Sequence, residues 1–184
     1  KRAAAAAIPL AELSRYLNAL TTLQAEFTQV NPDGTIATGQ LFIRRPGRVW
    51  FEYNPPDQTL VMAGAGSVAI FDGRSNEPPE QYPLGRTPLS LILAPEVDLA
   101  RARMVMGHAE VDGTTRVRAQ DPDRPEYGSI EMVFTAAPTE LRQLIIRDDT
   151  GGETTVILGE MKKGGSFPAS YFNISQEAER RRGR

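Results

Sequence analysis

The sequence predicts a single mainly β domain, folded as a barrel or strongly curved sheet of ten or eleven antiparallel strands. Extended segments recur at intervals of roughly 8–12 residues, which is typical of barrels. Breaker residues separate the segments, and the chain contains 16 Gly and 14 Pro. The connections are also too short for parallel crossovers, which need a dozen or more residues. The length of 184 residues fits one domain, so we take residues 1–184 as a unit.

One helix is predicted before the strands, over residues 9–20. Its apolar residues recur at spacings of three and four, namely Leu10, Leu13, Leu17 and Leu20. Pro9 suits the first helical turn, where its missing N–H costs nothing. From Leu23 the apolar period changes to two, which marks a strand of about eight residues.

Strands dominate the remaining sequence. We expect them over residues 35–45, 48–53, 58–63, 67–72, 80–83, 105–111, 114–120, 129–135, 141–147 and 153–161. The segment TPLSLILA, residues 87–94, does not alternate and is bracketed by Pro88 and Pro95, which predicts a helix of about two turns. A second helical piece is expected over 98–103 and a short closing segment over 168–172. Residues 1–7 and 176–184 are expected to be disordered tails.

Composition excludes several functions. The chain has no Cys, which excludes disulfides, Cys-ligated zinc and cysteine nucleophiles, and one His, His108, which excludes sites that need two. The formal net charge of -2 argues against nucleic acid as a partner. Asp148-Asp149 before Thr-Gly-Gly is read as a hairpin tip rather than a metal pair. We therefore expect no enzyme, no catalytic residue, no metal and no cofactor.

The two ends of the chain were read for targeting signals. No apolar run approaches the ~18 residues of a membrane span, and none has the form of a signal-peptide core. The run Ala3 to Ala7 is either the surroundings of a cleavage site or a helical lead-in. Arg180 to Arg182 could contact anionic lipid headgroups, although a disordered tail is the simpler interpretation.

The segment LFIRRPGRVWFEY, residues 41–53, carries the main functional hypothesis. If Leu41 and Ile43 point inward, alternation points Arg45 inward too, where its donors need acceptors. Free carbonyls at the end of the 87–94 helix, at residues 92–94, are the nearest candidates because Pro95 stops that helix. The alternative is a surface arginine beside a turn.

The sequence resembles the family of periplasmic outer-membrane lipoprotein carriers, LolA. The resemblance rests on LQAEFTQ (residues 23–29), GQLFIRRPGRVWFEYNPP (39–56), LVMAG (60–64), IFD (70–72) and PLSLILAPEVDL (88–99), in that order. It covers about residues 9–110, and the remainder matches in strand pattern. Trp50 departs from the family by lying one residue early, so that it would face outward.

The resemblance implies an incomplete, unclosed antiparallel barrel, with an N-terminal helix and short lid helices over an apolar cavity. It makes Arg45 the lid latch. The implied lid residues are Pro88, Leu89, Leu91, Ile92, Leu93 and Ala94, and the implied acyl-binding residues are Val49, Phe51, Tyr53, Leu60 and Met62.

The resemblance also implies a function. The chain would be a monomeric periplasmic carrier whose signal peptide has been removed. It would take acylated lipoproteins from an inner-membrane ABC transporter to an outer-membrane acceptor. The alternatives are a related half-barrel that binds free lipid or glycolipid, or an envelope lipoprotein sensor.

Overall fold

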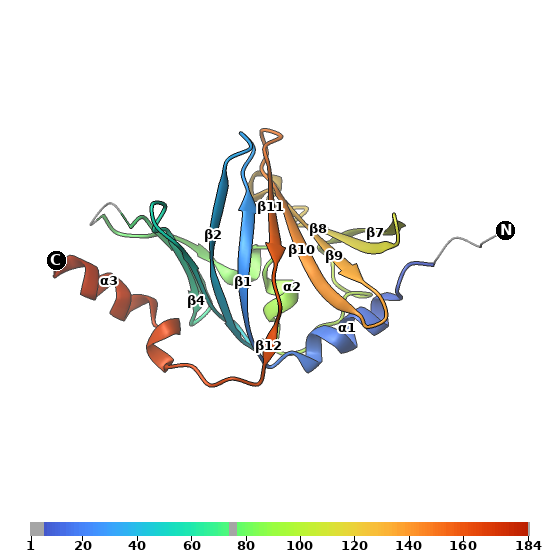
Figure 1. The fold of residues 1–184 in the computed structure, drawn as a ribbon, viewed down its shortest axis with the longest axis horizontal. Coiled ribbons are helices and arrows are strands. Elements are labelled where there is room, and N and C mark those ends of the chain that lie inside the picture. The colour runs from blue at the N-terminus through green and yellow to red at the C-terminus, as the bar shows by residue number, and fades with distance from the viewer. Residues whose placement is uncertain (1–5, 74–76, 184) are drawn as a thin grey trace.

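The strands form one antiparallel sheet that curves around its own inner face (Figure 1). This is a computed structural model, and it describes residues 6–73 and 77–183. The strands are β1 (Thr22–Val30), β2 (Ile36–Arg44), β3 (Arg48–Tyr53), β4 (Leu60–Gly64), β5 (Ser67–Phe71), β6 (Glu80–Pro83), β7 (Val105–Val111), β8 (Thr114–Gln120), β9 (Ser129–Thr135), β10 (Glu140–Arg147), β11 (Glu153–Leu158) and β12 (Lys162–Lys163).

Three α-helices and three 3₁₀ helices accompany the sheet in the described residues. They are α1 (Leu10–Ala19), α2 (Ser90–Leu93), α3 (Ile174–Arg182), η1 (Leu84–Arg86), η2 (Pro125–Tyr127) and η3 (Ala169–Phe172). None of the described helices is long and apolar enough to cross a membrane.

The strand order is β6-β5-β4-β3-β2-β1-β11-β10-β9-β8-β7, with β12 paired to β1. Most neighbours are consecutive in the chain, because short turns make consecutive strands antiparallel partners. The pairing of β1 with β11, two strands far apart in the sequence, joins the two halves of the sheet, with Phe27 opposite Leu158. In the described residues, β6 and β7 are the two edges and do not pair with each other, so the predicted unclosed sheet is confirmed.

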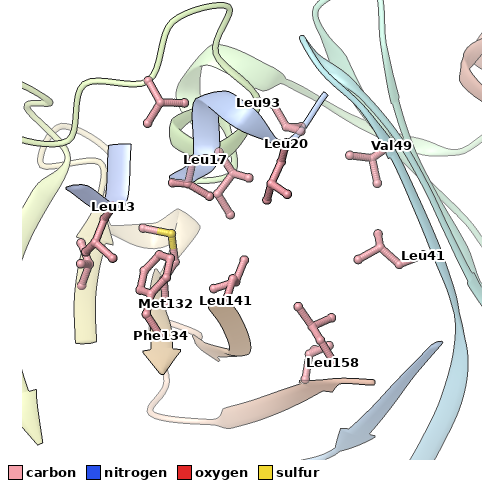
Figure 2. Packing of buried hydrophobic residues seen from close by; sticks show 14 of the residues in the cluster. Leu13, Leu17, Leu20, Leu41, Val49, Leu93, Met132, Phe134, Leu141 and Leu158 are labelled. Carbon is pink, nitrogen blue, oxygen red and sulfur yellow. The ribbon is translucent and has the colours of Figure 1, made fainter. Parts of the chain in front are cut away.

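The main hydrophobic core fills the concave side of the sheet. Leu13, Leu17 and Leu20, at or near α1, are no more than 5% exposed and belong to this core. They meet inward-pointing residues from both halves of the sheet, which Figure 2 shows as Leu41, Val49, Met132, Phe134, Leu141 and Leu158. The predicted apolar stripe of the first helix therefore packs against the sheet, as its spacing requires.

The C-terminal segment differs from the prediction. Residues 176–184 were expected to be a disordered tail, but residues 174–182 form helix α3, which lies beside β4 in Figure 1. Asn173 caps the helix by accepting a hydrogen bond from the Gln176 amide at 2.9 Å. Charge content misled the prediction, because Glu177 and Arg181 are buried as an ion pair at 2.7 Å.

The lid region also contains less regular helix than expected. Residues 87–94 were predicted as two helical turns, but α2 has only four residues. Many of its backbone hydrogen bonds join residues three apart, such as Leu91 N to Pro88 O at 3.1 Å, so the chain winds as a tight turn. Residues 98–103 form successive turns rather than a helix.

The strand count is higher than predicted. The segment expected as one strand over 153–161 ends at Leu158, and the chain then forms the short β12 against the start of β1. Of the predicted N-terminal tail, residues 1–5 lie outside the described residues. Residues 6 and 7 precede Ile8, whose amide donates to Thr115 Oγ1 at 2.8 Å.

Candidate functional site

The turn between β2 and β3 sets the position of the candidate site. The Arg45 amide donates to Thr21 O at 2.8 Å, which fixes the start of the turn. Gly47 has φ of +69°, a left-handed conformation that favours glycine, and its amide donates to Leu93 O at 2.9 Å. The tight turn therefore holds the Arg45 side chain beside the end of α2.

The Arg45 guanidinium joins the ends of two helices. Its Nε donates to Ile92 O at 2.8 Å and its Nη2 to Ala94 O at 2.6 Å, at the end of α2. Its Nη1 donates to Leu17 O at 2.8 Å and Leu20 O at 3.2 Å, at the end of α1. One side chain of a sheet turn thus fastens both helices over the concave face.

These acceptors suit a guanidinium. The last carbonyls of a helix have no partner within the helix and carry partial negative charge. Arginine offers five N–H donors in a rigid planar fork, so it can bond several such carbonyls at once. Burial lowers the pKa of the half-buried Arg45 below its ordinary value, and arginine stays charged in proteins.

The predicted lid residues lie over the main core. Ile92 and Leu93 are 5% and 1% exposed, and Pro88 is buried. Leu89, Leu91 and Ala94 are half-buried and pack against the same core. The lid segment is therefore held by apolar contacts below it and by Arg45 at its end.

Asn18 and Ser14 fasten the chain that follows α2, and our sequence reasoning missed both. The Asn18 side chain donates to Val97 O at 2.9 Å and accepts from Val97 N at 2.8 Å. Ser14 Oγ accepts from Leu99 N at 3.0 Å. The sequence did contain a pattern that could have indicated them. Ser14 and Asn18 are four residues apart beside the apolar stripe, so they share one face of the helix.

Three of the predicted acyl-binding residues line the concave face. Val49 is 4% exposed, and the half-buried Phe51 and Tyr53 pack against the main core. The Phe51 ring stacks on Phe27 with centroids 4.1 Å apart. Burial raises the pKa of Tyr53 to about 12, and its hydroxyl donates to Gln29 Oε1 at 2.6 Å.

Leu60 and Met62 are on the other face, so our expectation that they share a cavity with Val49 is wrong. Both belong to a second cluster, with Ala69 and Phe71, on the side of the sheet that α3 covers. The register explains this, because Met62 pairs with Trp50 and not with Val49. Directly paired residues share a face of the sheet.

Trp50 faces outward, as its position in the alternation predicts. Its ring stacks on Tyr171, a residue of η3, with centroids 4.8 Å apart. The Trp50 side chain therefore supports the C-terminal segment rather than the concave face.

The other residues singled out in the sequence have structural partners. The His108 ring lies 2.8 Å from Ile8 O. Asp148 Oδ1 accepts from the Gly152 amide at 2.7 Å within a hairpin turn. Across the described ranges, 6–73 and 77–183, no group of three or more His, Asp or Glu side chains is arranged to hold a metal ion.

The family model of the outer membrane lipoprotein carrier protein LolA matches residues 18–175. The chain belongs to the LolA family. This match spans most of the chain, from the end of α1 through the whole sheet to the start of α3, so it includes Arg45, the lid segment and the concave strands. The predicted family is thereby confirmed.

Relatives of this LolA-family chain carry the same description. An outer-membrane lipoprotein carrier protein of Methylococcus capsulatus is 22% identical, covering 92% of this chain and 85% of the relative. One from Chromobacterium violaceum is 25% identical, covering 92% and 84%. In fold, the chain is similar to an uncharacterized conserved protein from Thermus thermophilus, with a TM-score of 0.51, 10% identity and coverage of 88% and 90%.

A pocket of about 670 Å³ lies beside the lid of this LolA-family chain. Ser90 and Leu91 of α2 form one wall, and Met104 and Arg103 form part of another. Because Leu91 also packs against the main core, the pocket lies next to the apolar interior, with one lid residue between them.

Proposed function

We propose that this chain carries lipoproteins by holding their acyl chains against the concave face of the sheet. The relatives' descriptions and the family match support the general role. The concave face supplies the apolar surface that acyl chains need, through Val49, Phe51 and Tyr53. The pocket beside α2 adjoins the apolar interior, with Leu91 between them.

The observation that carries the proposal is the attachment of the lid. Arg45 holds the end of α2 by two hydrogen bonds, to Ile92 O and Ala94 O, and the end of α1 by further ones. Such a fastening can open without unfolding the sheet, because it joins short helices to a turn. The closed form then competes with bound cargo.

The energies fit reversible binding. Burying one CH₂ group contributes about 0.8 kcal/mol, so a long acyl chain contributes on the order of 10 kcal/mol before costs. In the structure, Leu17 and Leu93 already occupy this apolar space, at 0% and 1% exposed. An acyl chain must replace part of that packing, and each displaced leucine gives back about 1.5–3 kcal/mol. The net affinity is therefore low enough for release.

The finer parts of the proposal concern route and partners. The chain would work in the periplasm, receive cargo from an inner-membrane ABC transporter and pass it to the outer membrane. Transfer would involve no covalent step, because opening and closing the lid suffices. We propose that the protein does this as a monomer.

The test is a direct binding measurement on the full chain. An acylated fluorophore is added to the protein, and a triacylated lipopeptide is used to displace it. We expect saturable binding and displacement, while the same peptide without acyl chains has no effect. A fluorophore that shows no saturable binding would contradict the proposal.

Two comparisons separate the alternatives. Displacement by a free fatty acid or glycolipid, with none by the lipopeptide, would favour a carrier of free lipid. Native mass spectrometry of protein prepared gently from the periplasm gives the second comparison. A bound triacylated peptide supports the lipoprotein carrier, and a bound free lipid opposes it.

A further inference from the structure

The lid is fastened at a second point that does not depend on Arg45. Asn18, one residue before the end of α1, satisfies both backbone groups of Val97 with its side-chain amide, at 2.9 and 2.8 Å. One turn earlier, Ser14 accepts from Leu99 N at 3.0 Å. These bonds hold the chain just after the lid, whereas Arg45 holds its end at Ile92 and Ala94.

The distance between the two contacts on α1 is within reach of the chain that follows the lid. Positions 14 and 18 are separated by about 6 Å along a helix, at 1.5 Å per residue. Residues 97 and 99 can be at most about 6.6 Å apart, the span of two residues in a fully extended chain. The two segments run in opposite directions, since Asn18 meets Val97 and Ser14 meets Leu99. Both sets of bonds can therefore form together without distortion.

The backbone groups of the second fastening are buried, while Asn18 itself is exposed. Val97 and Leu99 are 4% and 1% exposed, and both belong to the main core. Ser14 is 7% exposed, and its hydroxyl also donates to Leu10 O at 2.8 Å. Water competes poorly for buried backbone groups, and leaving them unpaired is costly.

Asn18 is also in contact with the first fastening. Its Oδ1 accepts from Arg45 Nη2 at 3.4 Å, in addition to Val97 N at 2.8 Å. Loss of Arg45 removes only the longer of these two bonds. The Asn18–Val97 pair therefore survives release of Arg45.

We propose that Asn18 is the anchor about which the lid opens. When Arg45 lets go, α2 leaves the sheet turn while Val97 stays on α1. Asn18 is then a positioning residue for the proposed carrier function, because it limits the opening to the segment before Val97. Without it, the next fixed point after the lid is Leu99, whose amide donates to Ser14 Oγ at 3.0 Å. The free segment lengthens by two residues, and its chance of closing falls by less than about twofold.

This inference rests on the proposed function only for its cargo, and its test works without cargo. The absence of Cys allows pairs of engineered cysteines to be spin-labelled and their distances measured. The pair Glu12→Cys and Glu96→Cys reports the anchor, because these exposed residues lie on α1 and next to Val97. The pair Gln40→Cys and Ser90→Cys reports the lid against the sheet.

Two variants give opposite expected results. In Arg45→Leu the lid pair broadens, and the anchor pair keeps the narrow distance distribution of the unsubstituted chain. In Asn18→Ala the distance distribution of the anchor pair broadens. Arg15→Ala serves as control, because Arg15 is an exposed residue of α1 with no hydrogen bond to the lid among the described residues, and it should leave both pairs unchanged.

Several results would overturn the proposal. One is an anchor pair that broadens in Arg45→Leu as much as in Asn18→Ala, and another is an anchor pair unchanged in Asn18→Ala. If Asn18→Ala fails to fold, Asn18→Asp takes its place, because it keeps the acceptor for Val97 N and loses the donor to Val97 O. It should then broaden the anchor pair, and no broadening would overturn the proposal.

Adding acylated lipopeptide separates this inference from the proposed function. We expect the distance of the lid pair to shift and that of the anchor pair to stay constant in the unsubstituted chain. No response of either pair to lipopeptide would count against the carrier function, while the measurements without cargo would still decide the role of Asn18.

Discussion

Replacing Arg45 by leucine tests the fastening of the lid. The substitution removes hydrogen bonds to Ile92 O at 2.8 Å and Ala94 O at 2.6 Å, along with those to α1. Leucine keeps an apolar side chain in a half-buried place. We expect the fold to persist and the closed form to lose stability.

The size of the effect follows from the bonds that must break for α2 to leave. Counting only the two to Ile92 and Ala94, and taking the low end of about 1.5 kcal/mol for each charge-assisted bond because Arg45 is half-buried, the closed form loses about 3 kcal/mol. At 1.4 kcal/mol per tenfold, this raises the open fraction on the order of 100-fold. Apparent affinity for an acyl probe rises by the same factor until the open form predominates.

The assay measures both binding and release of the acylated fluorophore. Arg45→Leu should bind more tightly and release more slowly than the unsubstituted chain. The matched control is Arg48→Leu, which makes the same change in the same turn. Among the described residues, Arg48 donates to the turn's own carbonyls, of Pro46 at 3.2 Å and Arg45 at 3.5 Å. Equal binding and release in Arg45→Leu and the unsubstituted chain would refute the latch role, and equal effects of both variants would attribute the change to charge.

Three further predictions concern stability. Burial raises the pKa of Glu177, but hydrogen bonds from Arg180 and Arg181 outweigh it and bring the pKa below the ordinary 4.5. Its stabilisation is therefore present above pH 4.5 and lost as pH falls through the lower folded value. Urea unfolding at several acidic pH values should show that the free energy of unfolding depends less on pH in Glu177→Gln than in the unsubstituted chain. An equal pH dependence in both would contradict the stabilising role of the Glu177 carboxylate. The raised pKa of Tyr53, about 12, means that stability falls as pH rises from 10 to 12. Tyr53→Phe should remove the part of the stability loss that Tyr53 causes between pH 10 and 12. The phenol that ionises near pH 12 should also be missing from an absorbance titration of this variant. In Gly39→Ala a Cβ would meet the backbone of a neighbouring strand and the Phe27 ring. We expect a loss of about 1–3 kcal/mol in denaturant unfolding, and a variant as stable as the unsubstituted chain would show that the strands can separate there.

Local patterns predicted the strands well because each carries its own signal. Alternation over residues 48–53 placed Val49 and Phe51 on one face of the sheet and Trp50 on the other, and the structure agrees. Breakers such as Pro46-Gly47 located the turns. The failures are where a partner decides the outcome, as for Leu60, whose side of the sheet depends on its register with β3.

The C-terminal helix shows the same limit. The segment 176–184 is rich in charge, which by itself favours disorder. In the structure its Arg181 lies over the Phe71 ring, 4.7 Å from the centroid, and pairs with Glu177. Ile174 and Ala178 pack on the second cluster. The apolar outer face of β4 and β5 gives that segment a surface to pack on, which its own composition does not reveal.

The sequence by itself determined the antiparallel sheet, the first helix, the turn at Arg45 and the absence of cysteine chemistry. These depend on periodicity and breaker residues within short windows, which act through local backbone preference. For Arg45, alternation left two alternatives, an inward side chain or a surface arginine beside the turn. Tertiary structure decided what that side chain meets, because Leu17 O and Ala94 O come from segments far apart in the chain. It likewise decided the pairing of Asn18 with Val97, since hydrogen bonds between distant segments form only when packing of the apolar faces brings them together.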